Sequence, residues 1–247
     1  MSTTHEHRDY ETMSGDSAPF PRLRAAYLRA IARAWRDEDF LNELVACSAG
    51  HEPRGALPLL EKSYNFTFPY NVRFAIATTP RPQWRPNEVL GWFGVGDEFH
   101  IYLPERPEQL RRQIPGLADA LGIYCEMFPS LLGAATDGKS QAPDDFANFG
   151  VITSRILAMT WAHQAFAKEL FASKDARDLV QKSLSIIIPW NFRLRFSPKT
   201  WSDFESRLPP YNEITVYIPA PPREENDWPI ALAAYNDTGP QYPFTCA

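Results

Sequence analysis

The sequence predicts an α+β protein that contains the same module twice, with long helices and aromatic-rich strands packed in layers. Three observations support this prediction. Short segments recur in the same order in the second part of the chain. Each copy begins with an amphipathic helical pattern, and each helix is followed by a segment in which aromatic and polar residues alternate.

The internal repeat rests on three pairs of matching segments. One match of this length could arise by chance. Three in the same order indicate a duplication with later loop deletions, since the offset falls from 126 to 120 to 115 residues. The pairs are AWRDEDFLNEL (34–44) with TWAHQAFAKEL (160–170), FPYNVRF (68–74) with IPWNFRL (188–194), and IYLPERP (101–107) with VYIPAPP (216–222).

Each copy is expected to begin with one long helix, over 22–47 and over 151–171, because apolar residues recur there at the helical period. Aromatic side chains at such spacing usually pack in a core. We expect this of Trp35, Phe40, Trp161 and Phe166.

Residues 64–79 and 183–197 alternate with period two and are predicted as strands. Phe68 and Phe192 are expected to pack the two copies against each other, or against a paralogue. A final strand in each copy, EFHIYLP (98–104) or EITVYIP (213–219), stops at proline. An extra helix over 106–128 is expected to close the first copy.

These elements divide the chain into five parts. The expected parts are a disordered tail (1–20), a first module (21–127), a linker (128–150), a second module (151–222) and a C-terminal tail (223–247).

Composition excludes several classes of protein. The net charge of −5 gives no electrostatic footprint for nucleic acid, and no apolar run approaches the length of a membrane span. The three cysteines form no disulfide framework, and Cys47 and Cys125 are expected as small buried residues. His100 and His163 are isolated, so we expect structural or solvated roles for them. We expect a cytoplasmic protein that binds neither nucleic acid nor a membrane.

Each repeat resembles the α-subunit of nitrile hydratase and the related γ-subunit of thiocyanate hydrolase. The resemblance is carried by the helix AWRDEDFLNELVACSAG and by the strands YNVRF and WNFRL that contain Asn71 and Asn191. The enzyme family continues with a Cys-x-x-Cys-x-Cys claw that binds iron or cobalt. No cysteine follows either asparagine here, so we expect no metal, no cofactor, no catalytic residue and no enzyme activity.

The same module also occurs as the leader of ribosomally made peptides that other enzymes modify. With two modules and the ending YPFTCA, the chain resembles precursors of thiazole/oxazole-modified microcins (TOMMs), a bacteriocin-like class. The resemblance attaches to the motif residues Pro243 and Phe244 and implies Cys246 and Thr245 as modified residues. It also implies a cyclodehydratase or an oxidase as partner, and a mature product that could be exported.

The residue chemistry fits this resemblance. A cysteine thiol or threonine hydroxyl can attack the preceding carbonyl and form a thiazoline or methyloxazoline with loss of water; the thiol is the better nucleophile. The segment PAPPREENDWP (219–229) reads as a semi-rigid spacer, and the chain from about Trp228 onward as a mobile core peptide. The alternative is a metal-free interaction scaffold, acting as a homodimer or as half of a heterodimer with a paralogue.

Overall fold

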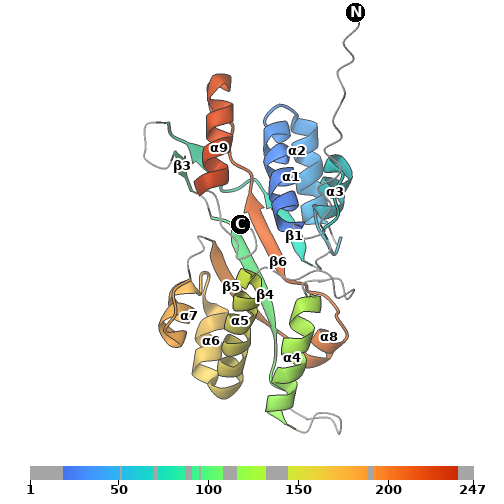
Figure 1. Cartoon of the computed structure of the whole chain (residues 1–247), viewed down its shortest axis with the longest axis vertical. Coiled ribbons are helices and arrows are strands. Elements are labelled where there is room, and N and C mark those ends of the chain that lie inside the picture. The colour runs from blue at the N-terminus through green and yellow to red at the C-terminus, as the bar shows by residue number, and fades with distance from the viewer. Residues whose placement is uncertain are drawn as a thin grey trace, which may run out of the picture.

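The computed structural model describes residues 19–50, 52–68, 72–86, 91–94, 96–107, 116–131, 144–188 and 192–238. It confirms the α+β class (Figure 1). The helices are α1 (Pro19–Ala34), α2 (Glu38–Ala49), α3 (Leu57–Tyr64), α4 (Leu117–Leu131), α5 (Asp144–Ala162), α6 (Gln164–Ala172), α7 (Arg177–Leu184), α8 (Trp201–Glu205) and α9 (Trp228–Thr238). The strands are β1 (Arg73–Ala77), β2 (Gln83–Trp84), β3 (Trp92–Phe93), β4 (Glu98–Pro104), β5 (Arg193–Lys199) and β6 (Glu213–Tyr217).

The prediction of one long helix at the start of each copy is wrong, because the helix is broken at the same repeat position in both. Asp37 has an extended backbone (φ −132°) and caps α2, accepting a hydrogen bond from Phe40 N at 2.9 Å. An aspartate side chain competes in this way for backbone N–H groups and starts a new helix. His163, the equivalent residue, has nearly the same backbone (φ −131°) between α5 and α6, but its side chain makes no capping hydrogen bond.

The first strand of each copy is shorter than the alternation predicts. Helices α3 and α7 occupy the start of the expected strand segments, and each is followed by a left-handed residue, Asn65 (φ 51°) or Ser185 (φ 53°). The strands therefore begin only at Arg73 and Arg193. The predicted final strands are confirmed as β4 and β6. Helices α4 and α5 extend into the predicted linker, of which 132–143 lie outside the described residues.

Strands from both copies form one four-stranded sheet in the order β1-β6-β4-β5. The parallel pairs β1–β6 and β4–β5 and the antiparallel pair β4–β6 each join a strand of the first copy to a strand of the second. The sheet thus belongs to both copies together. The module boundaries 21–127 and 151–222 stay predictions.

Hydrogen bonds between the copies come in equivalent pairs. Trp35 Nε1 donates to the carbonyl of Pro219, and Trp161 Nε1, its repeat partner, donates to the carbonyl of Pro104, both at 2.9 Å. Tyr102 N donates to Asn212 Oδ1, and Tyr217 N to Asp97 Oδ1, again both at 2.9 Å. The two copies are therefore related by an approximate two-fold axis through the centre of the sheet.

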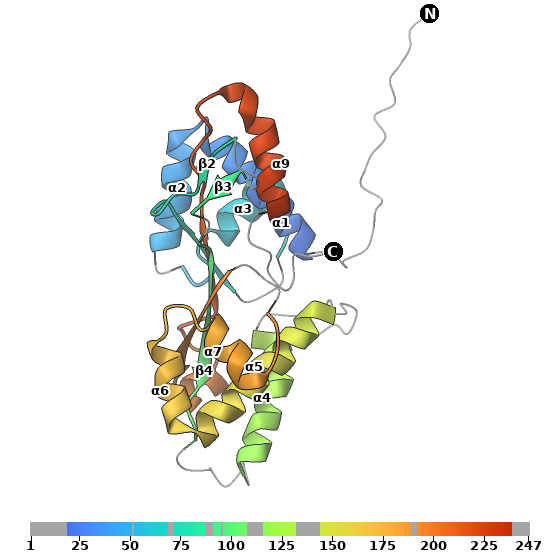
Figure 2. The same cartoon turned by 90° about the vertical axis from the view of Figure 1, so that its left-hand side faces the viewer.

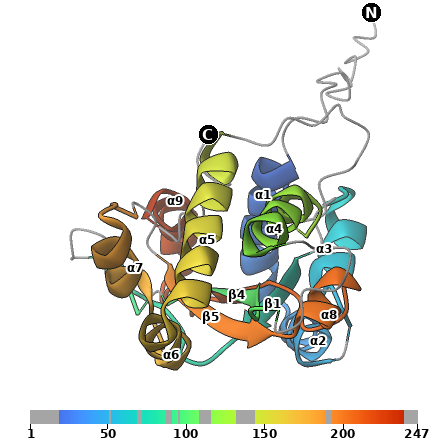
Figure 3. The same ribbon diagram turned by 90° about the horizontal axis from the view of Figure 1, so that it is seen from below.

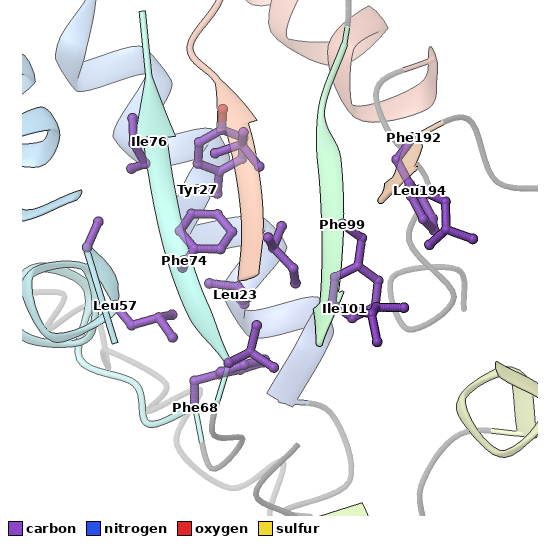
Figure 4. Close-up of a cluster of buried hydrophobic side chains, with 14 of the residues drawn as sticks. Leu23, Tyr27, Leu57, Phe68, Phe74, Ile76, Phe99, Ile101, Phe192 and Leu194 are labelled. Carbon is purple, nitrogen blue, oxygen red and sulfur yellow. The ribbon is translucent and has the colours of Figure 1, made fainter. Parts of the chain in front are cut away.

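The core lies between the apolar face of the sheet and the helices above it (Figures 2 and 3). Phe68 and Phe192 are 2% and 1% exposed, and Phe192 meets Phe99 of the other copy edge-to-face at 6.2 Å (Figure 4). The predicted packing of the two copies through aromatic strand faces is confirmed. Trp35, Phe40 and Trp161 are also buried, as expected, and Phe166 packs against the core while partly exposed.

Candidate functional site

The predicted site residues Pro243, Phe244, Thr245 and Cys246 lie outside the described residues, as do Asn71 and Asn191. The described chain ends with α9, which closes at Thr238. The candidate site that the structure defines is therefore the base of the C-terminal segment, where α9 joins the body.

The prediction of a mobile chain from Trp228 onward is wrong over Trp228–Thr238. Helix α9 packs against α1 and β3, with Ala231 fully buried and Tyr235 4% exposed. Trp92 Nε1 donates a hydrogen bond of 2.8 Å to the carbonyl of Ala231. Burial of one helix face and a hydrogen bond to its backbone hold the helix in place.

A fourth repeat match could have revealed this helix. ALAAY (231–235) in α9 corresponds to ALGIY (120–124) in α4, at an offset of 111 residues that continues the falling series. Ala120 and Tyr124 are buried like Ala231 and Tyr235. Helix α4 packs against α5 of the second copy, and α9 against α1 of the first. Helix α9 is therefore the last element of the second copy.

Six aromatic side chains hold α9 to the body. Trp92 is central: its ring lies 6.3 Å from Trp35, 5.4 Å from Trp84 and 5.7 Å from Tyr235. Trp35 also meets Trp228 edge-to-face at 5.5 Å, and Tyr27 lies 6.4 Å from Tyr235. We call these residues the aromatic anchor: Tyr27, Trp35, Trp84, Trp92, Trp228 and Tyr235. Aromatic pairs of this geometry each add about 0.5–1.5 kcal/mol beyond burial.

Charged residues support the start of α9. The guanidinium of Arg36 lies 5.1 Å from the Trp228 ring centroid and 3.4 Å from a carboxylate oxygen of Glu225, in the short 3-10 turn Glu225–Asp227. Trp228 Nε1 donates to the carbonyl of Pro222 at 3.1 Å. These contacts fix the proline-rich segment to the helix that follows it.

Two surface hollows flank this segment. The larger, of about 740 Å³, is lined by Gln83, Trp84, Arg85, Pro86, Ala220, Pro221, Pro222, Arg223, Glu224 and Asp227. The smaller, of about 340 Å³, is lined by Ala34, Trp35, Arg36, Asp37, Glu38, Leu41, Arg81, Ile218, Pro219 and Pro221. Both mix charges of either sign with aromatic or proline rings.

The aromatic anchor has no activated nucleophile. Burial raises the pKa of Tyr27 well above its usual value, the nearby Asp97 carboxylate raises it further, and the proximity of the Tyr235 hydroxyl opposes both effects. The phenol therefore stays protonated near neutral pH. The cluster can position α9, but it offers no reactive oxygen anion.

The cysteine predictions need correction. Cys125 is exposed on α4, and Cys47 is only partly buried on α2. The buried positions are Phe40, Leu44 and Ser48 on α2, and Ala120 and Tyr124 on α4. Within the described ranges, no three His, Cys, Asp or Glu side chains gather closely enough to hold a metal ion.

His100 lies at the centre of the sheet, 9% exposed, and its Nε2 is 2.8 Å from Ser197 Oγ. Burial, and secondarily the charge of Arg195, lower its pKa to about 4, while Glu213 opposes the shift. His163 is exposed at its helix boundary. A structural role for the first and solvation for the second agree with expectation.

We expect the shifted His100 pKa to make stability depend on pH. Between pH 6.5 and 4 the unfolded chain binds a proton at His100 that the folded chain does not bind. The contribution of His100 to the free energy of unfolding is therefore complete above pH 6.5 and falls as the pH drops towards 4. Between pH 7 and 5 the loss is about 2 kcal/mol. In urea titrations at both pH values, His100→Gln should lose correspondingly less stability than wild type. Equal losses in the two proteins would contradict the shift.

Residues 19–127 and 144–243 match the model of a family described as "Ribosomal natural product, two-chain TOMM family", and together they cover more than half of the chain. The chain belongs to this family. In this TOMM family chain, the two matched segments correspond to the two repeat copies, and the second includes the whole of α9.

The family match ends at Pro243, before Phe244, Thr245 and Cys246. No curated protein and no solved structure matches the chain. The resemblance to nitrile hydratase therefore stays a prediction. None of the helices in the described ranges is long and apolar enough to cross a bilayer.

Proposed function

We propose that the chain is the precursor of a modified peptide, in which the folded body up to Thr238 is the leader and residues 239–247 are presented for modification. Membership of a TOMM ribosomal natural product family supports this proposal. The observation that carries the division of roles is the anchoring of α9, because it places a fixed point immediately before the segment that contains Thr245 and Cys246.

The fixed point limits where a modifying enzyme can bind. Cys246 follows Thr238 by eight residues, which span at most about 29 Å when fully extended. The active site of the enzyme must therefore come within that distance of the end of α9. Surfaces close to α9, including the two hollows beside Pro219–Arg223, are the parts of the body best placed to contact the enzyme.

The proposed modification is a cyclodehydration at Cys246. The thiol sulfur bonds to the carbonyl carbon of Thr245, the carbonyl oxygen leaves as water, and the amide nitrogen forms a C=N bond to the same carbon. The product is a thiazoline, about 18 Da lighter. An oxidase that removes two hydrogens would give the azole. Thr245 is the second site, through its hydroxyl and the carbonyl of Phe244. The chain itself is then a substrate and not an enzyme, and its partners are a cyclodehydratase or an oxidase in the cytoplasm.

We expect mass spectrometry to locate the modification. The full-length chain, produced together with any cyclodehydratase encoded beside its gene, should lose about 18 Da in a C-terminal fragment containing Cys246. Cys246→Ala should abolish the loss at that position. Cys125→Ala, which removes an exposed cysteine of the body, should leave it unchanged. A peptide of residues 228–247 alone should be a poor substrate, since it lacks the body.

A second candidate function is a metal-free interaction scaffold that pairs with a paralogue. It is favoured by the packing of Trp228–Thr238 into the body, which leaves fewer residues for a core peptide than the sequence predicts. In the same experiment, an unaltered C-terminal fragment would reject the precursor proposal and leave the scaffold function.

A further inference from the structure

The four-stranded sheet is formed only by pairing between the two halves of the chain. Let the first half be residues 19–131 and the second half 144–238. No strand of the four-stranded sheet pairs with another strand of its own half, because β1 and β4 pair only with β5 and β6 in the described sheet. Each half alone would leave its sheet hydrogen bonds unmade, and these are costly to leave unpaired when buried. Each half therefore requires an opposite half.

The central pair of strands shows that the interface is built on a two-fold relation. Phe99 pairs with Ile214, its own repeat equivalent at the offset of 115 residues. On one side of this pair Glu98 faces Thr215, and on the other side His100 faces Glu213. Glu213 is the repeat equivalent of Glu98, and Thr215 that of His100, so the two pairs are equivalent with the copies exchanged. An interface with this symmetry is of the kind found between identical subunits of a two-fold dimer.

The outer strand pairs repeat one ion pair. Arg73 on β1 pairs in register with Glu213 on β6 and forms an ion pair with it. Arg193 on β5 pairs in register with Glu98 on β4, with charged atoms 4.0 Å apart. Both ion pairs cross between halves. Each ion pair joins a residue of the first half to a residue of the second half. The same ion pairs would form if the two halves came from different chains.

We propose that a second copy of this chain can supply the opposite half, giving a half-exchanged dimer. The first half of each chain pairs with the second half of the other chain. The dimer then contains two folded units, and each of them keeps every contact between halves that the monomer has. The only difference lies in residues 132–143, which join the halves. At ordinary concentration this link keeps the two halves of one chain together by its high effective concentration. The dimer carries two α9 helices, and hence two C-terminal segments, on one assembly.

The link can be tested directly in the full-length chain. Helices α4 and α5 pack against each other and run in opposite directions (Figure 2). Deleting 132–143 joins the end of α4 directly to the start of α5 and leaves no residues for a loop between them, so one chain can no longer pair its own halves. Light scattering should then give about twice the wild-type mass of 28.1 kDa. Replacing 132–143 by a Gly/Ser segment of equal length should keep the monomer. A folded monomer after the deletion would overturn the proposal.

Charge reversal identifies which halves pair and remains informative if the deletion fails to fold. A chain with Arg73→Glu repels its own Glu213, and a chain with Glu213→Arg repels its own Arg73. Produced together with different tags, the two chains should co-purify as a dimer, because exchange of halves restores both ion pairs. A single chain carrying both changes should stay monomeric. The Arg73 contacts to the carbonyls of Ser48 and Gly50 are lost in each chain that carries Arg73→Glu, so that variant alone, without the charge-reversed partner, is the control for their loss. If the double variant folds as a monomer and the single variants do not co-purify, the proposal is wrong.

Discussion

Replacing Phe192 by aspartate is expected to unfold the chain. Phe192 is 1% exposed and lies at the junction of the two copies, edge-to-face with Phe99. Loss of a buried phenylalanine ring costs about 3–5 kcal/mol. An unpaired charge in its place adds a further cost of about 3–5 kcal/mol. The sum is comparable to the whole stability of a typical domain, about 5–15 kcal/mol.

The matched control is Ile187→Asp. Ile187 lies five residues before Phe192 and is 86% exposed, so the same substitution should change stability by less than about 0.5 kcal/mol. Circular dichroism and size-exclusion chromatography of both variants check the prediction. A Phe192→Asp chain with the wild-type spectrum and elution volume would contradict the buried junction between the copies.

Replacing Ala231 by aspartate is expected to detach α9 from the body. The Ala231 side chain is fully buried against the body, and its carbonyl accepts the indole hydrogen bond of Trp92. A carboxylate there would be buried without a partner, at a cost of about 3–5 kcal/mol, unless the helix leaves. The rings of Trp35, Trp92 and Trp228 then become exposed, which should shift tryptophan fluorescence to longer wavelength.

Ile230→Asp separates detachment from a general effect of charge on α9. Ile230 is the preceding residue and is 61% exposed, so its substitution should leave fluorescence and stability nearly unchanged. Limited proteolysis should release a fragment beginning near Trp228 only from the Ala231 variant. If both variants behave alike, Ala231 does not lie at a packed interface. If the proposed function holds, the Ala231 variant should also be modified more slowly at Cys246, since the enzyme and its target segment are no longer held in fixed relation.

Much of the local structure was predictable from the sequence. Strands β4 and β6 follow the alternation that stops at proline, and the repeat predicts equivalent elements at equivalent positions. The helices lie where the helical period is found, but the breaks between helices were not predictable. In the sequence Asp37 resembles any other polar residue on an exposed helix face, and only the structure shows that its side chain caps Phe40 N. The exposed position of Cys125 was missed for a similar reason, since residue type alone says little about which face of α4 turns inward.

Helix α9 shows where sequence reasoning stopped short. Proline and turn-forming residues on both sides suggested a free tail, although ALAAY repeats the ALGIY of α4. The Ala-x-x-x-Tyr spacing places a small and a large side chain on one helical face, but that face is apolar only over a short length. Its packing depends on Trp35, which follows α1, and on Trp92 in β3, and both lie far away in the sequence.

By itself the sequence determined the α+β class, the duplication and the aromatic core, and it led to the proposal that Thr245 and Cys246 are modified. Only the tertiary structure decided that the two copies share one sheet and that α9 belongs to the body. The physical reason is that hydrophobic periodicity records which face of an element is buried, and this is a local property. Which strand pairs with which is set by hydrogen bonds and packing between residues 95 or more positions apart, and both choices of partner satisfy the same local pattern.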